Sequence, residues 1–413
     1  MSLLLKYKGE ANFTIANVIQ SVSSMIMGIV AASCIAPDEF GVYQSIILIA
    51  TYATFLHLGV FNGLNRNLAY YKAQGNIEKM QTSVDTSCSV AKVNALIGFF
   101  VGAGIILYLW YGGYSSFYLL SGAYLLVSMV LTPYSTHLAC TYRSGQEFGR
   151  LGTLKNKQNV FFCLLSLLPY YMGLLGKVIA DMLNCIIGFL LLRNKPPYPA
   201  KTKGNIQSLK DLLSVGFPLL VGGYIYQVFM IADRTYIATH LSSREMGLYT
   251  IAGYCISLFM VLPVALNTLL YPRAAARFGE TGDKCALLPF WKKSILLFSM
   301  VLIPLVVVAY FVIPWAVELF LPKYVDGIEA ARISLLSCLT YVYLGPSVIF
   351  GTLKKNLGYI VMISCCLLAF WLITSVWPEY FQTIESVAYL RFTLSLVLMI
   401  YSILHTYIMI IKK

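Results

Sequence analysis

The sequence predicts an all-α integral membrane protein with about 12 transmembrane helices, arranged as two six-helix bundles related by pseudo-two-fold symmetry. Three observations lead to this prediction: an apolar composition, a series of apolar segments of spanning length, and an internal repeat. The 413 residues are 59% hydrophobic and 11% charged, whereas soluble proteins carry about 25% charged residues. The mean hydropathy is +0.74. A water-soluble core cannot bury this much apolar surface, so we expect a membrane protein without a nucleic-acid partner.

Apolar segments follow one another along the whole chain. A spanning helix needs roughly 20 apolar residues, and the first span is expected to be retained because no cleavage site follows it. Lys177 and Asp181 interrupt the fifth and sixth segments and are expected to pair on one helix face, since they are four residues apart. The twelve candidate spans are residues 12–35, 41–63, 86–111, 116–139, 158–175, 177–193, 214–239, 247–270, 293–313, 332–353, 358–377 and 387–410.

The loops between these segments alternate in charge. The net charge is +13, and most of the 30 Lys and Arg residues lie in one alternating set of loops. Positive charge collects on the cytoplasmic side of membrane proteins, so both termini are predicted to face the cytoplasm. The even number of spans agrees. Residues 196–213 are basic and rich in proline, which predicts a cytoplasmic linker between bundles at residues 1–195 and 214–413.

One loop-and-helix pattern occurs in both halves of the chain. Residues 40–43 (FGVY) align with residues 246–249 (MGLY), and each segment follows a Glu residue in a short loop. A long apolar segment and a loop with Arg and Gly come next in both halves. With an even number of spans per half, the halves have the same orientation, as in transporters built from parallel repeats. Such repeats predict a substrate path between the two bundles.

Three stretches carry a resemblance to a known family. The segments APDEFGVYQSI, IADRTYIATHLSSREMGLYTIA and LFLPKYVDGIEAARI resemble bacterial polysaccharide-transport proteins, in particular the O-antigen flippases of the multidrug/oligosaccharidyl-lipid/polysaccharide exporter superfamily. The resemblance covers the spans from end to end and rests on the order of loose motifs. It implies two bundles that alternate between inward-open and outward-open states, an undecaprenyl-pyrophosphate-linked oligosaccharide as substrate, and the bacterial inner membrane as location.

An adjacent acid and base interrupt the seventh span. Residues 229–237 read FMIADRTYI, with Asp233 next to Arg234. Neighbours on a helix point about 100° apart, so the two side chains serve different surfaces. Arg234 shares a stripe with Tyr224 and Gln227 that has the character of a cavity wall. We expect Arg234 to bind the pyrophosphate or sugar and Asp233 to lock a neighbouring helix or bind a coupling cation. A structural pair, each partner satisfied by another helix, is the alternative.

Polar residues also recur at helical spacing in the first two spans. Asn17 and Gln20 lie on one stripe of the first span, and His57 lies in the second. These side chains either line the cavity or bind helices together. His57 could relay protons, because His titrates near neutral pH, or it could be a satisfied buried side chain.

Asn residues surround an Arg at the predicted inner end of the second span. Residues 62–68 read NGLNRNL, with Asn62 four residues before Arg66. Arg66 and its repeat counterpart Arg273 are candidate phosphate ligands in the inward-open state. Ordinary positive-inside charge explains both Arg residues equally simply.

The sequence contains neither a Walker A motif nor metal-ligand spacing, so no cofactor is expected. An ion gradient, or consumption of the substrate on the outer side, would then drive transport, and the family resemblance implies protons or sodium as the coupling ion. The expected partners are the lipid-linked oligosaccharide and membrane lipids, with contact to the pathway polymerase conceivable. The two bundles already form one covalent pseudo-dimer, so a monomer is expected.

Two other functions compete with the flippase. A multidrug or cation antiporter of the same superfamily should favour acidic cavity residues, whereas this chain has few acids within its spans. A membrane glycosyltransferase or polymerase needs room for a catalytic platform. The loop that holds Asp38 and Glu39 is too short for one, and no outer loop is large. The sequence therefore predicts a transporter and no enzyme.

Overall fold

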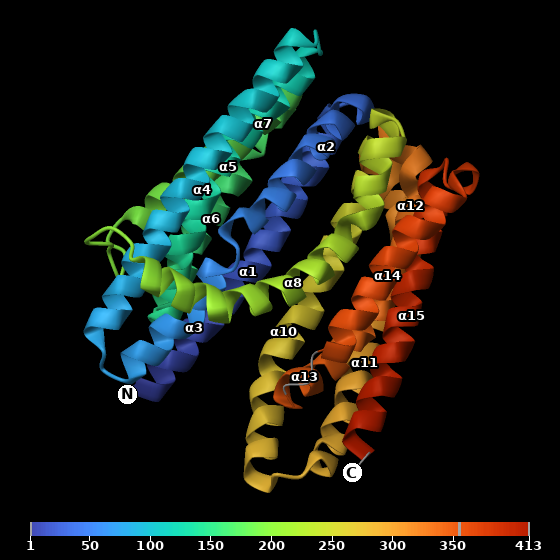
Figure 1. The fold of residues 1–413 in the computed structure, drawn as a ribbon. Coiled ribbons are helices and arrows are strands. Elements are labelled where there is room, and N and C mark those ends of the chain that lie inside the picture. The colour runs from blue at the N-terminus through green and yellow to red at the C-terminus, as the bar shows by residue number, and fades with distance from the viewer. Residues whose placement is uncertain (1, 354–356, 412–413) are drawn as a thin grey trace. The chain divides into compact units, whose positions relative to one another are not determined.

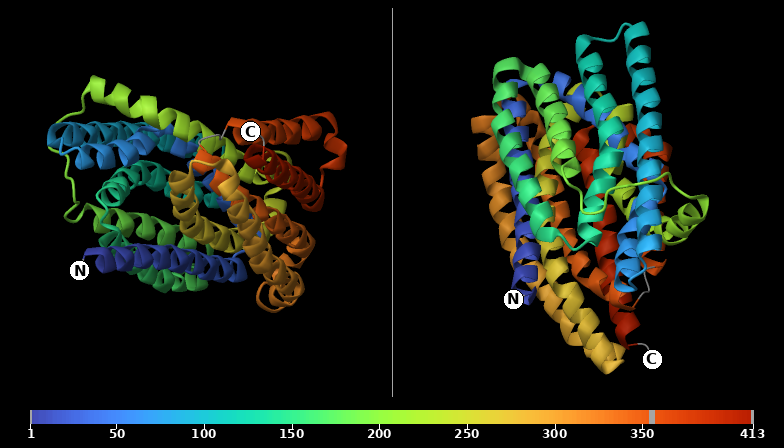
Figure 2. Two further views of the ribbon diagram at one scale, coloured as in Figure 1. Left: turned by 90° about the horizontal axis from the view of Figure 1, so that it is seen from below. Right: turned by 90° about the vertical axis from the view of Figure 1, so that its left-hand side faces the viewer.

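The computed structural model describes residues 2–353 and 357–411, and these residues form helices joined by short turns. Within these ranges, the side chains of some residues are not described, namely those of residues 2–8, 73, 261–262, 264–269, 271–273, 275–276, 345–348 and 351. The chain divides into two compact units, unit 1 at residues 1–224 and unit 2 at residues 225–413. Figures 1 and 2 show the helices of each unit.

Unit 1 consists of long helices that pack side by side, with α6 lying along α1 and α4 along α5. The long apolar helices are separated by short turns at glycine, as at Gly75 and Gly113, whose positive φ angles suit a residue without a side chain. The elements are α1 (Ser2–Cys34), α2 (Pro37–Ala53), η1 (Thr54–His57), α3 (Val60–Ala73), α4 (Ile77–Tyr111), α5 (Ser116–Ser144), α6 (Phe148–Leu165), α7 (Leu167–Arg193) and the first part of α8 (Ile206–His240).

The first part of α8 packs tightly on α3 within unit 1. A Cβ atom added to Gly63 would lie 2.1 Å from the Leu212 carbonyl oxygen, and one added to Gly216 would lie 2.0 Å from the Gly59 carbonyl oxygen. These glycines let the two backbones approach, as small residues do in membrane helix pairs. Leu212 joins the core formed by the buried apolar face of α3. Residues 206–224 therefore belong to unit 1 by their contacts.

Unit 2 begins within α8 and is built around α12, which contacts both α10 and α15. Between its longer helices lie short 3-10 turns, of which η4 separates α12 from α13. The elements are α9 (Ser243–Leu248), α10 (Thr250–Thr281), η2 (Lys284–Leu287), α11 (Leu288–Phe320), η3 (Pro322–Gly327), α12 (Ile328–Leu339), η4 (Thr340–Tyr343), α13 (Leu344–Leu353), α14 (Leu357–Val376), η5 (Pro378–Tyr380) and α15 (Ile384–Ile411).

Nine described helical segments are long and apolar enough to cross a membrane. They correspond to nine of the predicted spans. The other three predicted spans lie in α6, in α10 and in the α12–η4–α13 segment. The α6 helix begins with several Arg and Lys residues, and η4 divides the last segment into two short helices. Part of α10 lies among the residues whose side chains are not described.

The border between the predicted fifth and sixth spans falls at a glycine turn. Gly173 has φ 55° and ψ −132°, so the backbone leaves the helical conformation there. A Cβ atom added to Gly176 would lie 2.1 Å from the Leu168 carbonyl oxygen, so the segments before and after the turn lie against each other. The sequence placed the border between residues 175 and 177 on the basis of Lys177. That residue instead lies within the helix after the turn.

The predicted linker is attached to unit 1 by hydrogen bonds. Asp85 of α4 accepts hydrogen bonds from the backbone N–H groups of Lys201 at 2.8 Å and Thr202 at 3.2 Å. It also accepts from the Thr202 hydroxyl at 2.5 Å. The Thr86 hydroxyl accepts from the Asn205 N–H, and the Ser89 hydroxyl accepts from the Gly204 N–H. One face of α4 therefore holds residues 201–205 in place.

Candidate functional site

Asp233 and Arg391 form a buried ion pair in unit 2. Arg391 Nη1 lies 3.6 Å from Asp233 Oδ1, and only 4% and 1% of the two side chains are exposed. Arg391 comes from α15, and its Nη1 also donates to the Phe229 carbonyl at 2.9 Å. Its guanidinium stacks 4.7 Å from the Phe229 ring centroid. Burying two charges is tolerated only when further hydrogen bonds satisfy the charged groups, and both Arg391 and Asp233 make such bonds.

The remaining oxygen of Asp233 is also satisfied. Tyr249 Oη donates to Asp233 Oδ2 at 2.8 Å, and the backbone N–H of Arg234 donates to Oδ1 at 2.8 Å. Asp233 therefore connects α8 with the start of α10 and with α15. Among the described residues, no group of three His, Cys, Asp or Glu side chains is placed to hold a metal ion. The geometry favours the predicted helix-locking role of Asp233 over a cation site.

Arg234 lies beside this ion pair but points to a different surface. Its guanidinium rests against the backbone of α10, because a Cβ atom added to Gly253 would lie 2.2 Å from Arg234 Nη2. The side chain is half-buried. No acceptor for its guanidinium is found within residues 2–353 and 357–411 where side chains are described. Since Arg391 neutralises Asp233, the charge of Arg234 is left uncompensated in this region.

The two repeat tyrosines make equivalent interactions in their own units. In unit 1, Tyr43 Oη of α2 donates a hydrogen bond to Asp181 Oδ2 of α7. Lys177 Nζ lies 2.5 Å from the same oxygen and 5.3 Å from the Tyr43 ring centroid. In unit 2, Tyr249 donates to Asp233, which pairs with Arg391. Each unit thus joins its motif tyrosine to a buried carboxylate and a buried cation. The predicted pairing of Lys177 with Asp181 is confirmed.

The other predicted residues on α8 and in the repeat loops lie in different environments. Gln227 is half-buried in unit 2, and Tyr224 lies against the Phe55 ring in unit 1. Arg66 is exposed on α3. Arg273 belongs to α10, but its side chain lies outside the described residues. Their assignment to a substrate path stays a prediction.

Asn17 and Gln20 of α1 contact Lys155 of α6, a residue that lies in a predicted loop between spans and carries ordinary loop charge in the sequence. Lys155 Nζ donates to Asn17 Oδ1 at 2.9 Å and to Gln20 Oε1 at 3.3 Å. It also lies 5.3 Å from the Phe13 ring centroid. The stripe predicted on the first span therefore joins α1 to α6, as the second of the two predicted alternatives states. Gln20 is exposed and remains accessible.

His57 is used locally at the end of η1. Its Nδ1 accepts a hydrogen bond from the Gly59 N–H at 3.0 Å, and its ring lies 4.8 Å from the Phe61 ring centroid. The arrangement is that of a satisfied His at a turn, the second of the two predicted alternatives. Asn62 is half-buried in α3, one turn beyond.

Sequence reasoning did not place Arg391, Tyr249 or Lys155 in a site. Arg391 lies within the predicted span at residues 387–410, and its partner Asp233 lies far away in the sequence. A signal is nevertheless present in the sequence. A lone charge within an apolar segment requires a partner, and Asp233 is an acid within another predicted span. Tyr249 belongs to the repeated segment at residues 246–249, for which the repeat alone indicates no chemical role.

Known proteins resemble this chain in sequence and in fold. The family model described as "Polysaccharide biosynthesis protein" matches residues 8–276. A search of curated proteins gives no match. Among solved structures, an inward-facing multidrug resistance MATE transporter of the MOP superfamily has a TM-score of 0.75 at 15% identity, covering 95% of this chain and 94% of that chain.

Two further solved structures show the same likeness. The outward-facing conformation of a multidrug resistance MATE transporter has a TM-score of 0.66 at 15% identity and covers 99% of this chain and 96% of that chain. A MOP superfamily transporter from Pyrococcus furiosus Vc1 (DSM3638) has a TM-score of 0.65 at 16% identity, with 98% and 95% covered. The predicted fold class, an all-α membrane protein of about 12 spans in two bundles, is confirmed by this likeness.

The two kinds of comparison answer different questions. At 14–16% identity the solved structures show the fold and no activity. The family model covers well over half of the sequence. This multi-pass membrane protein therefore has the MATE transporter fold and belongs to the polysaccharide biosynthesis protein family.

Proposed function

We propose that the protein is a flippase that moves an undecaprenyl-pyrophosphate-linked oligosaccharide, such as an O-antigen repeat unit, from the cytoplasmic to the periplasmic leaflet. It would act in the bacterial inner membrane by alternating access, with both termini in the cytoplasm. Family membership points to polysaccharide biosynthesis, and the fold is one that transporters use. A transporter on this fold moves its substrate without a catalytic residue.

The uncompensated charge of Arg234 carries this proposal. A pyrophosphate cannot cross hydrocarbon without compensation, because burying an unpaired charge is very costly. Asp233 and Arg391 cancel each other at 3.6 Å, so the described part of this region keeps the positive charge of Arg234. The planar guanidinium of Arg can make two parallel hydrogen bonds to phosphate oxygens. The site therefore suits an anionic substrate.

The same charge argues against the multidrug antiporter. A cationic drug would be repelled by Arg234, while the acid beside it is taken up by Arg391 and Tyr249. In the transporter from Pyrococcus furiosus, the reverse polarity of the binding pocket suggests a different function. The positive charge of Arg234 likewise supports an anionic substrate for this chain.

The guanidinium of Arg234 lies in the space that a side chain at Gly253 would fill. The neighbouring Asp233 is held from three directions, so it is not available to neutralise Arg234. Coupling to a proton or sodium gradient, action as a monomer and contact with a polymerase remain parts of the proposal.

Reconstitution in liposomes tests the proposed function. Purified protein is incorporated into vesicles that contain an undecaprenyl-pyrophosphate oligosaccharide, and an enzyme on one side reports how fast the sugar becomes accessible. We expect acceleration over protein-free vesicles. Arg234→Ala should slow it tenfold or more, because a hydrogen bond to a charged group contributes about 1.5–3 kcal/mol. Arg234→Lys should keep part of the rate, since the charge remains.

Gly253→Ala tests whether transport depends on the position of the Arg234 side chain, because the variant moves that side chain and keeps its charge. The new methyl group displaces the flexible end of Arg234 and leaves the backbone in place, so transport should fall while folding is preserved. Arg277→Ala is the matched control, because this exposed Arg of α10 already pairs with Glu280 at 3.7 Å. Equal rates in wild type and Arg234→Ala would refute the role of Arg234. An absence of any acceleration by folded protein would refute the flippase.

A further inference from the structure

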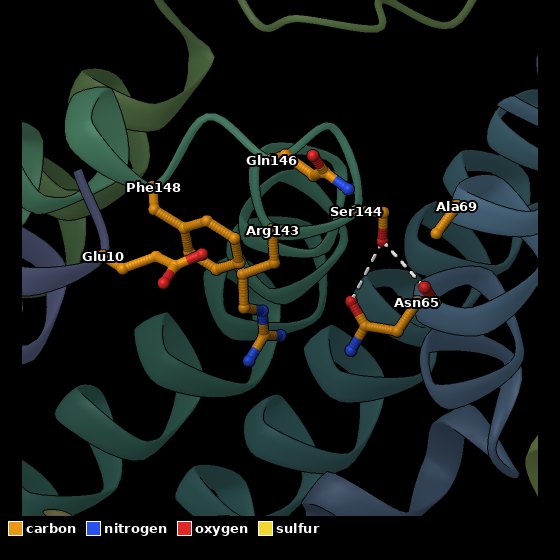
Figure 3. Close-up of a pocket in the computed structure, with 7 residues that line it drawn as sticks. All are labelled: Glu10, Asn65, Ala69, Arg143, Ser144, Gln146 and Phe148. Carbon is orange, nitrogen blue, oxygen red and sulfur yellow. Dashed lines mark hydrogen bonds between the residues drawn. The ribbon is translucent and has the colours of Figure 1, made fainter. Parts of the chain in front are cut away.

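A pocket of about 360 Å3 opens in unit 1, where α1, α3 and the turn between α5 and α6 come together. Its size lies within the range of about 300–1,000 Å3 that is usual for small-ligand sites. Figure 3 shows the lining side chains and the space between them. The positive-inside prediction places this end of unit 1 on the cytoplasmic side. The lining includes Glu10, Asn65, Arg143, Ser144, Gln146 and Phe148.

The polar groups of this pocket are only partly satisfied. Arg143 Nη2 donates to Cys140 Sγ at 3.2 Å, a weak acceptor. Its Nε atom is buried and has no partner within the described residues. Buried polar groups normally have a partner, and an exception calls for an explanation. Arg143 also lines the pocket, so a ligand there would meet its guanidinium group.

Asn65 is held in position by a neighbour. The Ser144 hydroxyl lies 3.1 Å from the Asn65 carbonyl oxygen and 3.2 Å from its Oδ1. In Figure 3 the amide nitrogen of Asn65 points away from Ser144. An amide oxygen fixed in this way leaves the two N–H donors for another group. Asn65 is therefore oriented in advance as a donor.

The turn at the rim carries a polar side chain where glycine would fit better. Gln146 has φ 60°, a left-handed conformation that costs most L-residues roughly 1–2 kcal/mol. The conformation belongs to the end of α5, where the Gln146 N–H donates to the Arg143 carbonyl and the Glu147 N–H donates to the Tyr142 carbonyl, both at 3.0 Å. The amide of Gln146 is one of the groups around the pocket in Figure 3. The turn thus places an additional donor and acceptor at the rim.

The charges and the aromatic ring of the lining identify the class of ligand. Glu10 and Arg143 carry opposite charges, so the lining has no net charge that would select a phosphate. Phe148 offers an apolar ring face, and it packs 5.7 Å from the Phe13 ring. A sugar ring has an apolar C–H face and a rim of hydroxyl groups that both donate and accept. Carboxylate, guanidinium and amide groups beside one aromatic ring match that pattern.

We propose that this pocket binds one sugar ring of the carried oligosaccharide. Phe148 covers the apolar face of the sugar, and Glu10, Arg143, Asn65 and Gln146 bind its hydroxyl groups. The assignment of the sugar to a lipid-linked oligosaccharide rests on the proposed function, whereas the presence of a sugar site does not. The pocket selects among sugars, while Arg234 in unit 2 binds the charged group that all such lipids share.

Direct binding tests the sugar site without a transport assay. Saturation-transfer NMR is recorded with the full-length protein in lipid nanodiscs and four free probes: glucose, galactose, N-acetylglucosamine and rhamnose. We expect saturation of at least one sugar, reduced fivefold or more by Phe148→Ala and by Gln146→Ala, and retained by Phe148→Trp. Arg277→Ala is the matched control and should bind the same sugar normally, because this exposed Arg of unit 2 pairs with Glu280. Near-native melting temperatures identify the variants that are folded.

Three results would overturn the sugar site. The first is that folded protein saturates none of the four sugars. The second is that the saturation signal is unchanged in both Phe148→Ala and Gln146→Ala. The third is that inorganic pyrophosphate displaces the sugar at equal or lower concentration, which would make the pocket an anion site. Failure of the flippase assay with sugar binding intact would remove only the proposed function. Loss of sugar binding with flipping intact would remove only the sugar site.

Discussion

Asp233 of α8 and Arg391 of α15 face each other within unit 2, with 3.6 Å between Oδ1 and Nη1. This contact, with the hydrogen bond from Arg391 to the Phe229 carbonyl, joins two helices that are far apart in the sequence. It also leaves Arg234 without a neighbouring acid to neutralise its charge. The packing of the unit and the free charge of Arg234 thus depend on the same carboxylate.

Breaking this pair should destabilise the protein strongly. Arg391→Met leaves Asp233 buried without its cation, which costs about 3–5 kcal/mol. The double variant Asp233→Leu/Arg391→Met should recover most of this loss, since a buried pair can be replaced by apolar side chains. Thermal unfolding in detergent, analysed as a double-mutant cycle, measures the coupling. Additive losses in the double variant would contradict the pairing.

The repeat tyrosines should contribute equally to stability in their two units. Tyr43→Phe and Tyr249→Phe each remove a hydrogen bond to a buried carboxylate, worth about 1.5–3 kcal/mol. We expect both variants to melt at lower temperature by a similar amount. Tyr380→Phe is the control, because Tyr380 is 70% exposed. A loss for one tyrosine alone would show that the two interactions are not equivalent.

Asp85→Ala should release the linker from α4. Asp85 accepts from two backbone N–H groups and from the Thr202 hydroxyl, while Lys201 and Lys203 are exposed. Trypsin should cut after these lysines roughly tenfold faster in the variant, since each bond to a carboxylate contributes about 1.5–3 kcal/mol. Limited proteolysis followed by mass spectrometry measures the rates. Asp211→Ala is the control, because this position of α8 is exposed, and trypsin should cut it at the wild-type rate. Equal cleavage rates for all three proteins would show that Asp85 does not hold the linker on α4.

Gly63→Ala should destabilise unit 1, whereas Gly223→Ala should not. The methyl group at position 63 would meet the Leu212 carbonyl oxygen at 2.1 Å, but nothing lies within 4 Å of a Cβ atom at position 223. Overpacking costs typically 1–3 kcal/mol, and Gly→Ala in an open helix gains up to about 1 kcal/mol. Melting temperatures of the two variants should therefore shift in opposite directions. If the melting temperature of Gly63→Ala rose as well, α8 and α3 would be able to separate without cost.

Hydropathy predicts most of this fold because each span is a local property of the chain. The repeat at residues 40–43 and 246–249 extends the prediction to two equivalent halves. The border within the fifth and sixth spans was displaced because Lys177 suggested an interface, whereas burial beside Asp181 and the Tyr43 ring accommodates its charge inside a helix. The turn at Gly173 follows backbone conformation, which hydropathy does not report.

The site was harder to predict because its contacts are made between distant segments. Asp233 and Arg234 stood out as charges in an apolar run, but nothing local indicates which of them is neutralised. That depends on Arg391, which α15 brings to Asp233. Lys155 was indistinguishable from loop charge until α6 placed it beside Asn17 and Gln20. The pocket around Arg143 combines four segments and has no signature in any one of them.

The close packing of α8 on α3 has a consequence for any attempt to separate the two halves. The second predicted bundle begins at residue 214, yet Gly216 is built into the first unit, as is Leu212 just before it. The transfer is one-sided, because unit 2 contains no residue from the first half of the chain. A first half that ends at residues 196–199 would therefore lack the segment that covers α3. The second half would carry that segment without the surface on which it packs.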